Sequence, residues 1–104
     1  NTSTIVFDEI DVGVSGRISQ AIANVLKDLS QKHQVFCITH QPIIAAAADH
    51  HFTVSKFLKE SKTLTNIDEL KKPEDRQAEL ALLAGGDIFE AKAYAASLLD
   101  QHAA

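Results

Sequence analysis

Hydrophobic residues follow two different periods along the first half of the chain. Residues 4–7 and 35–39 are β-branched and apolar runs without polar alternation, which is typical of strands buried on both faces of a parallel sheet. Between these runs, apolar side chains recur at helical spacing over about residues 17–32. They are Ile18, Ile22, Val25, Leu26 and Leu29. The pattern predicts a strand–helix–strand unit with parallel strands.

Residues 43–67 are expected to form a short helix followed by two strands. Residues 43–49 are rich in alanine and predict a short helix. Residues 51–57 and 62–67 have strand composition, and the polar residues 58–61 predict the turn between them. We therefore expect a hairpin to follow the parallel unit.

Helix start and stop signals dominate the last third of the chain. Pro73 suits the first turn of a helix that runs to about Ala84. Gly85-Gly86 ends this helix, and Asp87 is expected to cap a last helix, from residue 88 to about 101. The predicted fold class is α/β, with a parallel βαβ core, a following hairpin and C-terminal helices.

Composition and charge exclude several classes of protein. The length of 104 residues suits one domain, and 45% hydrophobic with 23% charged residues disfavours disordered and coiled-coil proteins. A net charge of −4 disfavours a strongly basic nucleic-acid-binding surface. No apolar run is long enough to span a bilayer. The single Cys37 excludes an internal disulfide, suits a reducing compartment and is expected in the core.

Candidate chemistry gathers at the ends of the two apolar strands. Asp8 and Glu9 follow the first strand, and His40 follows the second. Because parallel strands end at one edge of a sheet, we expect these side chains to collect at one rim. Asp8 suits Mg²⁺, directly or through water, and Glu9 suits a general base that deprotonates water for attack on a γ-phosphoryl group. His40 can hydrogen-bond that phosphoryl group or the water.

These residues resemble a known group of ATPases. Residues 5–9, Ile-Val-Phe-Asp-Glu, look like a Walker B segment of ABC-type ATPases, residues 11–17 resemble the D-loop region, and His40 falls where the switch histidine of the H-loop would be. Essentially the whole chain is similar to the C-terminal end of the RecN family of bacterial DNA repair proteins, which are SMC-like ATPases. Three further segments carry that similarity, at residues 39–42, 48–56 and 76–86.

The resemblance implies a part of a P-loop NTPase head that binds ATP and Mg²⁺. It places Asp11 and Ser15 at the interface between two heads, where they help to align the opposing nucleotide. Read from the residues alone, Asp11 and Ser15 can equally shape the loop or cap the helix. Hydrolysis would be coupled to DNA double-strand break repair and recombination, in the bacterial cytoplasm at the nucleoid and not at a membrane.

One motif of that family does not occur in this sequence. The P-loop pattern G-x-x-x-x-G-K-[ST], which cradles phosphates, is missing. Residues 83–87 superficially resemble the ABC signature but lie after the Walker B segment, so we interpret them as a helix stop and a new cap. Residues 1–104 are thus expected to be the C-terminal subdomain of a head. The P-loop, the signature and the coiled-coil arms would precede residue 1, and the chain by itself should be inactive.

Other interpretations remain open. The chain can belong to another SMC, Rad50-like or transporter head, to a non-catalytic α/β binding module with an incidental acidic rim, or to a single-domain Mg²⁺-dependent phosphotransfer protein. Neighbouring residues of a strand point to opposite faces, so His50-His51 is not expected to bind zinc. Five lysines can form a solvated face or a weak DNA-facing patch in the assembled protein. They are Lys56, Lys59, Lys62, Lys71 and Lys72.

Overall fold

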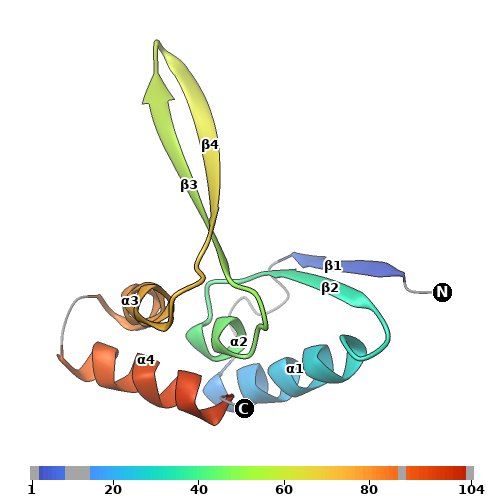
Figure 1. Cartoon of the computed structure of the whole chain (residues 1–104). Coiled ribbons are helices and arrows are strands. Elements are labelled where there is room, and N and C mark those ends of the chain that lie inside the picture. Colours follow the sequence, from blue (N-terminus) through green and yellow to red (C-terminus); the bar gives the residue numbers. More distant parts are fainter. Residues whose placement is uncertain (1–2, 9–14, 87–88, 103–104) are drawn as a thin grey trace.

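The computed structural model of the chain describes residues 3–8, 15–86 and 89–102. Its elements occur in the predicted order, and Figure 1 shows the helices below a short parallel ribbon and a tall hairpin. The elements are β1 (Thr4–Asp8), α1 (Gly16–Leu29), β2 (Gln34–Ile38), α2 (Pro42–Ala46), β3 (Phe52–Lys59), β4 (Lys62–Glu69), α3 (Pro73–Ala84) and α4 (Phe89–Gln101).

Strands β1 and β2 pair in parallel, as the sequence predicts. The register runs from Thr4 opposite Gln34 to Asp8 opposite Ile38. The backbone N–H of Gln34 also donates to the carbonyl oxygen of Ser3 at 3.0 Å. Helix α1 forms the connection, so the first half is the expected βαβ unit.

The expectation that both strands are buried on both faces is wrong for this chain. Phe7 and Cys37 point toward α1 and are half-buried, and Cys37 packs beside buried Ala23. On the opposite face, Val6, Phe36 and Ile38 are 62%, 47% and 53% exposed. The reason is geometric. This sheet has two strands and helix α1 on one side, so nothing in the described residues covers its other face.

Helix α1 ends three residues earlier than predicted, and it begins one residue earlier. Ser30 terminates it, with its hydroxyl donating to the carbonyl oxygen of Lys27 at 2.6 Å. Its fully buried residues are the small Ser19 and Ala23, whereas Ile18 and Val25 of the predicted apolar face are about half exposed. The spacing of the hydrophobic residues therefore predicted where the helix lies, but small side chains form the face that packs against the rest of the chain.

A helical cluster of α2, α3 and α4 contains most of the buried core. Leu80 is fully buried between helices that are rich in alanine, which allows close approach. The other buried members are Ala45, Ala46, Ala81, Ala91, Ala95 and Leu98. Helix α3 spans the predicted residues, and α2 ends three residues earlier than expected.

The glycine stop after α3 is confirmed. Gly85 and Gly86 adopt φ angles of 150° and 111°, which disfavour residues with a Cβ. The N–H of Gly86 donates to the carbonyl oxygen of Ala81 at 2.9 Å, which closes the helix end. The predicted cap at Asp87 and the helix start at residue 88 lie outside the described residues.

The hairpin of β3 and β4 is longer than the sequence pattern suggests. Residues 58 and 59, predicted as part of the turn, belong to β3, and only Glu60 and Ser61 turn the chain. Both have positive φ, at 52° and 64°, which is the backbone that two-residue hairpin turns require. All eight residues of β4 are exposed, and Figure 1 shows the hairpin standing away from the helices.

Candidate functional site

The parallel register brings two of the predicted site residues to one edge. Asp8 is the last residue of β1 and lies opposite Ile38, the last residue of β2. His40 follows two residues later, before α2 begins at Pro42. The C-terminal edge of a parallel pair is where open α/β sheets bind ligands. The expected rim is therefore present for Asp8 and His40.

The side chain of Asp8 lies on the uncovered face of the β1–β2 strand pair. Side chains alternate along a strand, so Asp8 shares a face with Val6, and its cross-strand neighbour on that face is Ile38. All three are exposed. The carboxylate thus borders a bare apolar surface rather than the helical side of the sheet.

The starts of two helices complete this rim. The Ser15 hydroxyl caps α1 by accepting from the N–H of Ile18 at 3.4 Å. A Cβ at Gly16 would lie 3.5 Å from the Ile43 Cδ1 atom, so the first turns of α1 and α2 are in contact. Ser15 therefore has the capping role left open by the sequence. Its function at an interface between heads stays a prediction.

A local turn shapes the segment that carries His40. The hydroxyl of Thr39 accepts a hydrogen bond from the N–H of Gln41 at 3.0 Å, a turn that side-chain hydroxyls commonly form. Pro42 then begins α2, with a fixed φ that suits the first helical position. This Thr-His-Gln-Pro segment directs the chain from the sheet edge into the helix.

The other two site residues, Glu9 and Asp11, lie outside the described residues. Within the part that is described, no group of three or more His, Cys, Asp or Glu side chains can hold a metal. Of the described residues at this edge, Asp8 offers one carboxylate that can serve as a Mg²⁺ ligand. That fits an ion that commonly retains several waters and takes further ligands from substrate phosphates.

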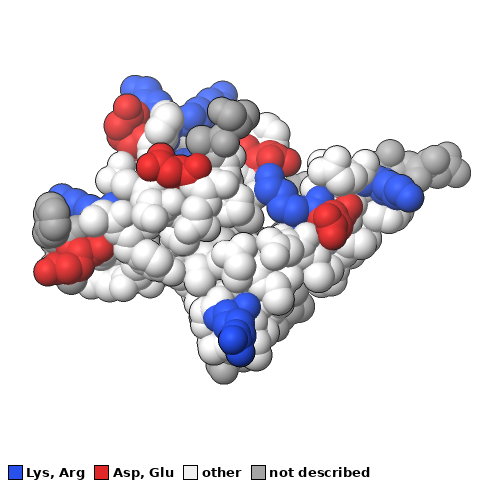
Figure 2. Space-filling view, turned by 90° about the horizontal axis from the view of Figure 1, so that it is seen from below, with Lys and Arg blue, Asp and Glu red and all other residues white. Residues whose placement is uncertain are grey.

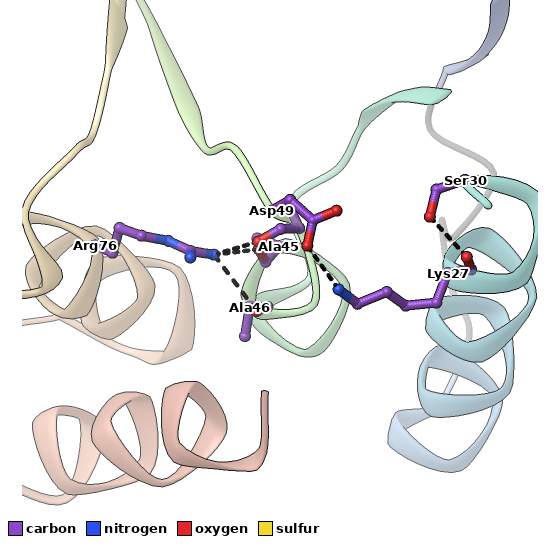
Figure 3. Close-up of polar contacts among 7 residues, drawn as sticks. Lys27, Ser30, Ala45, Ala46, Asp49 and Arg76 are labelled. Carbon is purple, nitrogen blue, oxygen red and sulfur yellow. Dashed lines mark hydrogen bonds and ion pairs between the residues drawn. The ribbon is translucent and has the colours of Figure 1, made fainter. Parts of the chain in front are cut away.

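Sequence reasoning missed the contact that fixes α2 beneath the rim. The Nη2 atom of Arg76, on α3, donates to the carbonyl oxygens of Ala45, Ala46 and Ala48, at 3.1, 3.4 and 3.1 Å. Helix ends leave such carbonyls without intrahelical partners. Figure 3 shows the guanidinium reaching this end of α2. The pairing joins residues about 30 positions apart, so no local pattern signals it.

An ion pair supports the same end of α2 from the other side. Lys27 of α1 lies 2.9 Å from Asp49, just beyond α2 (Figure 3). The hydrogen bond from Lys27 is the main reason that the pKa of Asp49 is lowered, and burial partly opposes it. Helix α2 is thereby tied to both α1 and α3, which positions the preceding His40 segment.

The two adjacent histidines have different surroundings, although both precede β3 and neither lies in the strand in which His51 was expected. Exposed His50 lies 3.2 Å from Glu69, through its Nδ1 atom. His51 is buried, and its Nδ1 atom has no hydrogen-bond partner among the described residues. Burial is the main cause of the lowered pKa of His51, and the nearby charge of Arg76 adds to it.

The fold can now be compared with solved structures. A chain studied for the structural biochemistry of ATP-driven dimerization and DNA-stimulated activation of SMC ATPases matches with a TM-score of 0.54. The match covers 65% of this chain and 40% of that chain, at 20% sequence identity. A likeness at this identity concerns the fold, which is that of part of an SMC-type ATPase head.

Sequence comparison is more specific. The chain is 46% identical to the DNA repair protein RecN of Synechocystis sp., over 99% of this chain and 20% of that protein. It is 43% identical to RecN of Bacillus subtilis, over 97% of this chain and 18% of that protein, and 41% identical to RecN of Haemophilus influenzae, over 93% and 18%. No protein-family model matches the chain.

These matches place the chain in the RecN family, and the expected resemblance to the C-terminal part of that family is confirmed. The chain spans about a fifth of the length of the curated relatives that it matches. Among the described residues, no helix combines the length and the apolar character needed to cross a membrane.

Proposed function

We propose that residues 1–104 form the C-terminal subdomain of an SMC-like ATPase head, within a RecN-type protein that uses ATP in DNA repair. The observation that carries this proposal is that Asp8 and the segment with His40 both follow the parallel pair of β1 and β2 at the edge where these strands end. This arrangement suits a phosphate-bearing ligand that is approached by a histidine and by a cation held at the carboxylate.

Three residues have distinct roles at this edge. Asp8 helps to hold Mg²⁺, which neutralises charge on the phosphates when it is bound. Glu9, the next residue, orients and deprotonates the attacking water. His40 donates a hydrogen bond toward the γ-phosphoryl group. The residues of this chain therefore supply the base and one metal ligand but no phosphate cradle.

The uncovered face of the β1–β2 strand pair supports the proposal that further residues of the head pack against it. Val6, Phe36 and Ile38 are exposed beside Asp8. On the helical side, α1 and Phe7 line an apolar groove of about 240 Å³, and Figure 2 shows a face of the chain on which much of the surface carries no charged side chain. Relatives of five times this length have the residues to cover these surfaces. The remainder would include the P-loop, the signature motif and the coiled-coil arms.

A second head would complete the site. In this arrangement ATP lies between two heads, with Asp11 and Ser15 at their interface, and hydrolysis separates the heads. The relatives are named as DNA repair proteins, and we assign the assembled protein to double-strand break repair by recombination at the bacterial nucleoid. Another SMC-like or transporter head is disfavoured because the curated relatives that match over almost the whole chain are RecN proteins.

The test of the catalytic role is Glu9→Gln in the longer RecN-type protein. ATP binding should be retained, and the hydrolysis rate should fall by a factor of about 100 or more, as expected for loss of a general base. The matched control is Glu60→Gln in the hairpin turn, which removes the same charge far from the rim. Wild-type hydrolysis by Glu9→Gln would contradict the base assignment. A longer protein without any ATPase activity would favour a non-catalytic binding module.

The requirement for the remainder of the head can be tested on residues 1–104 alone. Without a phosphate cradle, Mg²⁺–ATP loses most of its ligands, so the isolated chain should show no saturable ATP binding by calorimetry at micromolar concentrations. Tight binding by this chain would show that the remainder is not needed.

A further inference from the structure

Arg76 holds one end of a short helix whose other end adjoins the rim. Helix α2 has five residues and begins at Pro42, two residues after His40. The contacts of Arg76 lie at the opposite end of α2 (Figure 3). At a rise of about 1.5 Å per residue, a helix of this length is about 8 Å long. A displacement of its last turn therefore also moves the residues that precede its first.

Helix α2 cannot fix its own position. A helix of little more than one turn is unstable in water by itself, so its place depends on tertiary contacts. Its buried side chains are Ile44, Ala45 and Ala46, which are apolar, and apolar packing is not directional. Hydrogen bonds are directional. The bonds from Arg76 on α3 therefore restrict how α2 lies in ways that packing alone does not.

The side chain of Arg76 bonds only this end of α2 within the part of the chain that the structure describes. Its hydrogen bonds all start at Nη2 and end on the carbonyl oxygens of Ala45, Ala46 and Ala48. Its Nε atom is buried and has no partner among those residues. Burial is the main cause of the lowered pKa of Arg76, and the charge of Asp49 opposes it. A charged donor that is partly removed from water makes strong hydrogen bonds, so this contact is a firm anchor.

The second cation near this end of α2 is held less firmly. Lys27 bonds the carboxylate of Asp49, which follows α2, rather than carbonyl oxygens of the helix. The side chains of Lys27 and Asp49 are 36% and 70% exposed. Exposed ion pairs contribute little because water and salt screen them. Lys27 therefore offers a matched control for Arg76.

We propose that Arg76 is a positioning residue for the ATP site, and that it fixes the location of His40 by holding the far end of α2. This inference rests on the proposed function, in which His40 bonds the γ-phosphoryl group. Helix α3 supplies none of the rim residues described above. It takes part in hydrolysis all the same, because a displacement of α3 against α2 would move His40.

Steady-state ATP hydrolysis by the longer RecN-type protein tests this proposal. Arg76→Ala should lower kcat at least about tenfold, since a misplacement of about 1 Å can cost about a hundredfold in rate. KM should stay within about twofold, because the phosphate cradle that mainly holds the nucleotide is not altered. Arg76→Lys keeps the charge and should recover part of kcat. Lys27→Ala should change kcat by less than about threefold.

Leu80→Ala separates positioning from a loss of stability. Leu80 lies one turn after Arg76 on α3 and is fully buried, so its truncation destabilises the same cluster but keeps the guanidinium. Rates are compared per folded molecule, at a temperature at which circular dichroism shows the variants folded. An equal fall of kcat in Leu80→Ala and Arg76→Ala would overturn the proposal. An unchanged kcat in Arg76→Ala would overturn it as well.

The imidazole signals of His40 provide a second measurement, which needs no ATP. In NMR spectra of residues 1–104, these signals should shift or broaden in Arg76→Ala and stay close to those of the wild type in Lys27→Ala. Unchanged signals in Arg76→Ala would overturn the proposal. A longer wild-type protein without ATPase activity would instead contradict the proposed function, and the His40 signals would still test the coupling through α2.

Discussion

The α2–α3–α4 cluster and the β1–α1–β2 unit differ in how completely they bury their apolar residues. In the cluster, Leu80 and Leu98 are buried among alanines contributed by all three helices. In the unit, Val6 and Ile38 remain more than half exposed, although they lie in the most apolar strands of the chain. Burial of apolar area is the main driving force of folding, so the two regions contribute unequally to stability.

This difference fits the proposal that other parts of the head cover the strands β1 and β2, whereas the helical cluster is packed within this chain. Residues that hold the cluster together have partners within this chain, as with Arg76 on the end of α2. The strands instead present apolar side chains next to Asp8, at the rim where a ligand would bind. The proposed ATP site therefore lies beside apolar strands that the described residues leave uncovered on one face. Four changes test this comparison.

The largest expected effect is at the centre of the cluster. Leu80→Ala should lower the free energy of unfolding by about 2–5 kcal/mol, because it leaves a cavity among tightly packed helices. The paired change Val6→Ala, on the bare face of the ribbon, should cost less than about 0.5 kcal/mol in the isolated chain. Urea denaturation followed by circular dichroism measures both. Equal decreases in the free energy of unfolding would show that the β1–β2 strand pair is as well packed as the helical cluster.

Removal of the contact between α3 and α2 should have the next largest effect. Arg76→Ala removes the guanidinium donor from the carbonyl oxygens of Ala45, Ala46 and Ala48 and should cost about 1–3 kcal/mol. Exposed Arg17, changed to alanine, controls for loss of a positive charge. Thermal unfolding compares the two variants, and a matching small effect in both would show that the guanidinium does not anchor α2.

Acid should destabilise the folded chain through buried His51. The pKa of His51 is lowered in the folded chain, mainly by burial, so the unfolded chain binds a proton more readily. Stability should therefore be highest above the unfolded value of about 6.5 and fall as the pH drops below it. His51→Gln should flatten this profile between pH 7 and 5, and adding His102→Gln, whose pKa burial also lowers, should flatten it further. An unchanged slope in both variants would contradict the assignment.

The smallest change expected is at the start of α1. Ser15→Ala removes the hydroxyl that caps the helix and should cost about 0.5 kcal/mol, near the low end for such caps because the contact is 3.4 Å long. Ser15→Asp should restore most of the loss, since aspartate also caps helices. The exposed hairpin residue Ser55, changed to alanine, is the control. A Ser15→Ala loss above that of Arg76→Ala would mean that the rim is more tightly coupled to the core than its exposure indicates.

The order and type of the elements were predictable because they depend on local periods. The helical spacing from Ile18 to Leu29 located α1, and Gly85-Gly86 marked the end of α3. The meeting of Asp8 and His40 also followed, since parallel strands must end at the same edge. Helix and hairpin boundaries were less accurate, because Ser30 and the turn at Glu60-Ser61 use backbone conformations that composition does not specify.

The sequence by itself determined the family and the βαβ unit, because motif order and hydrophobic period are properties of neighbouring positions. Tertiary structure alone decided which faces are covered. An apolar strand has the same sequence whether its second face is packed or bare, and the uncovered side of Val6 and Ile38 appears only when the helices are placed. The Arg76 contact likewise depends on residues that are distant along the chain.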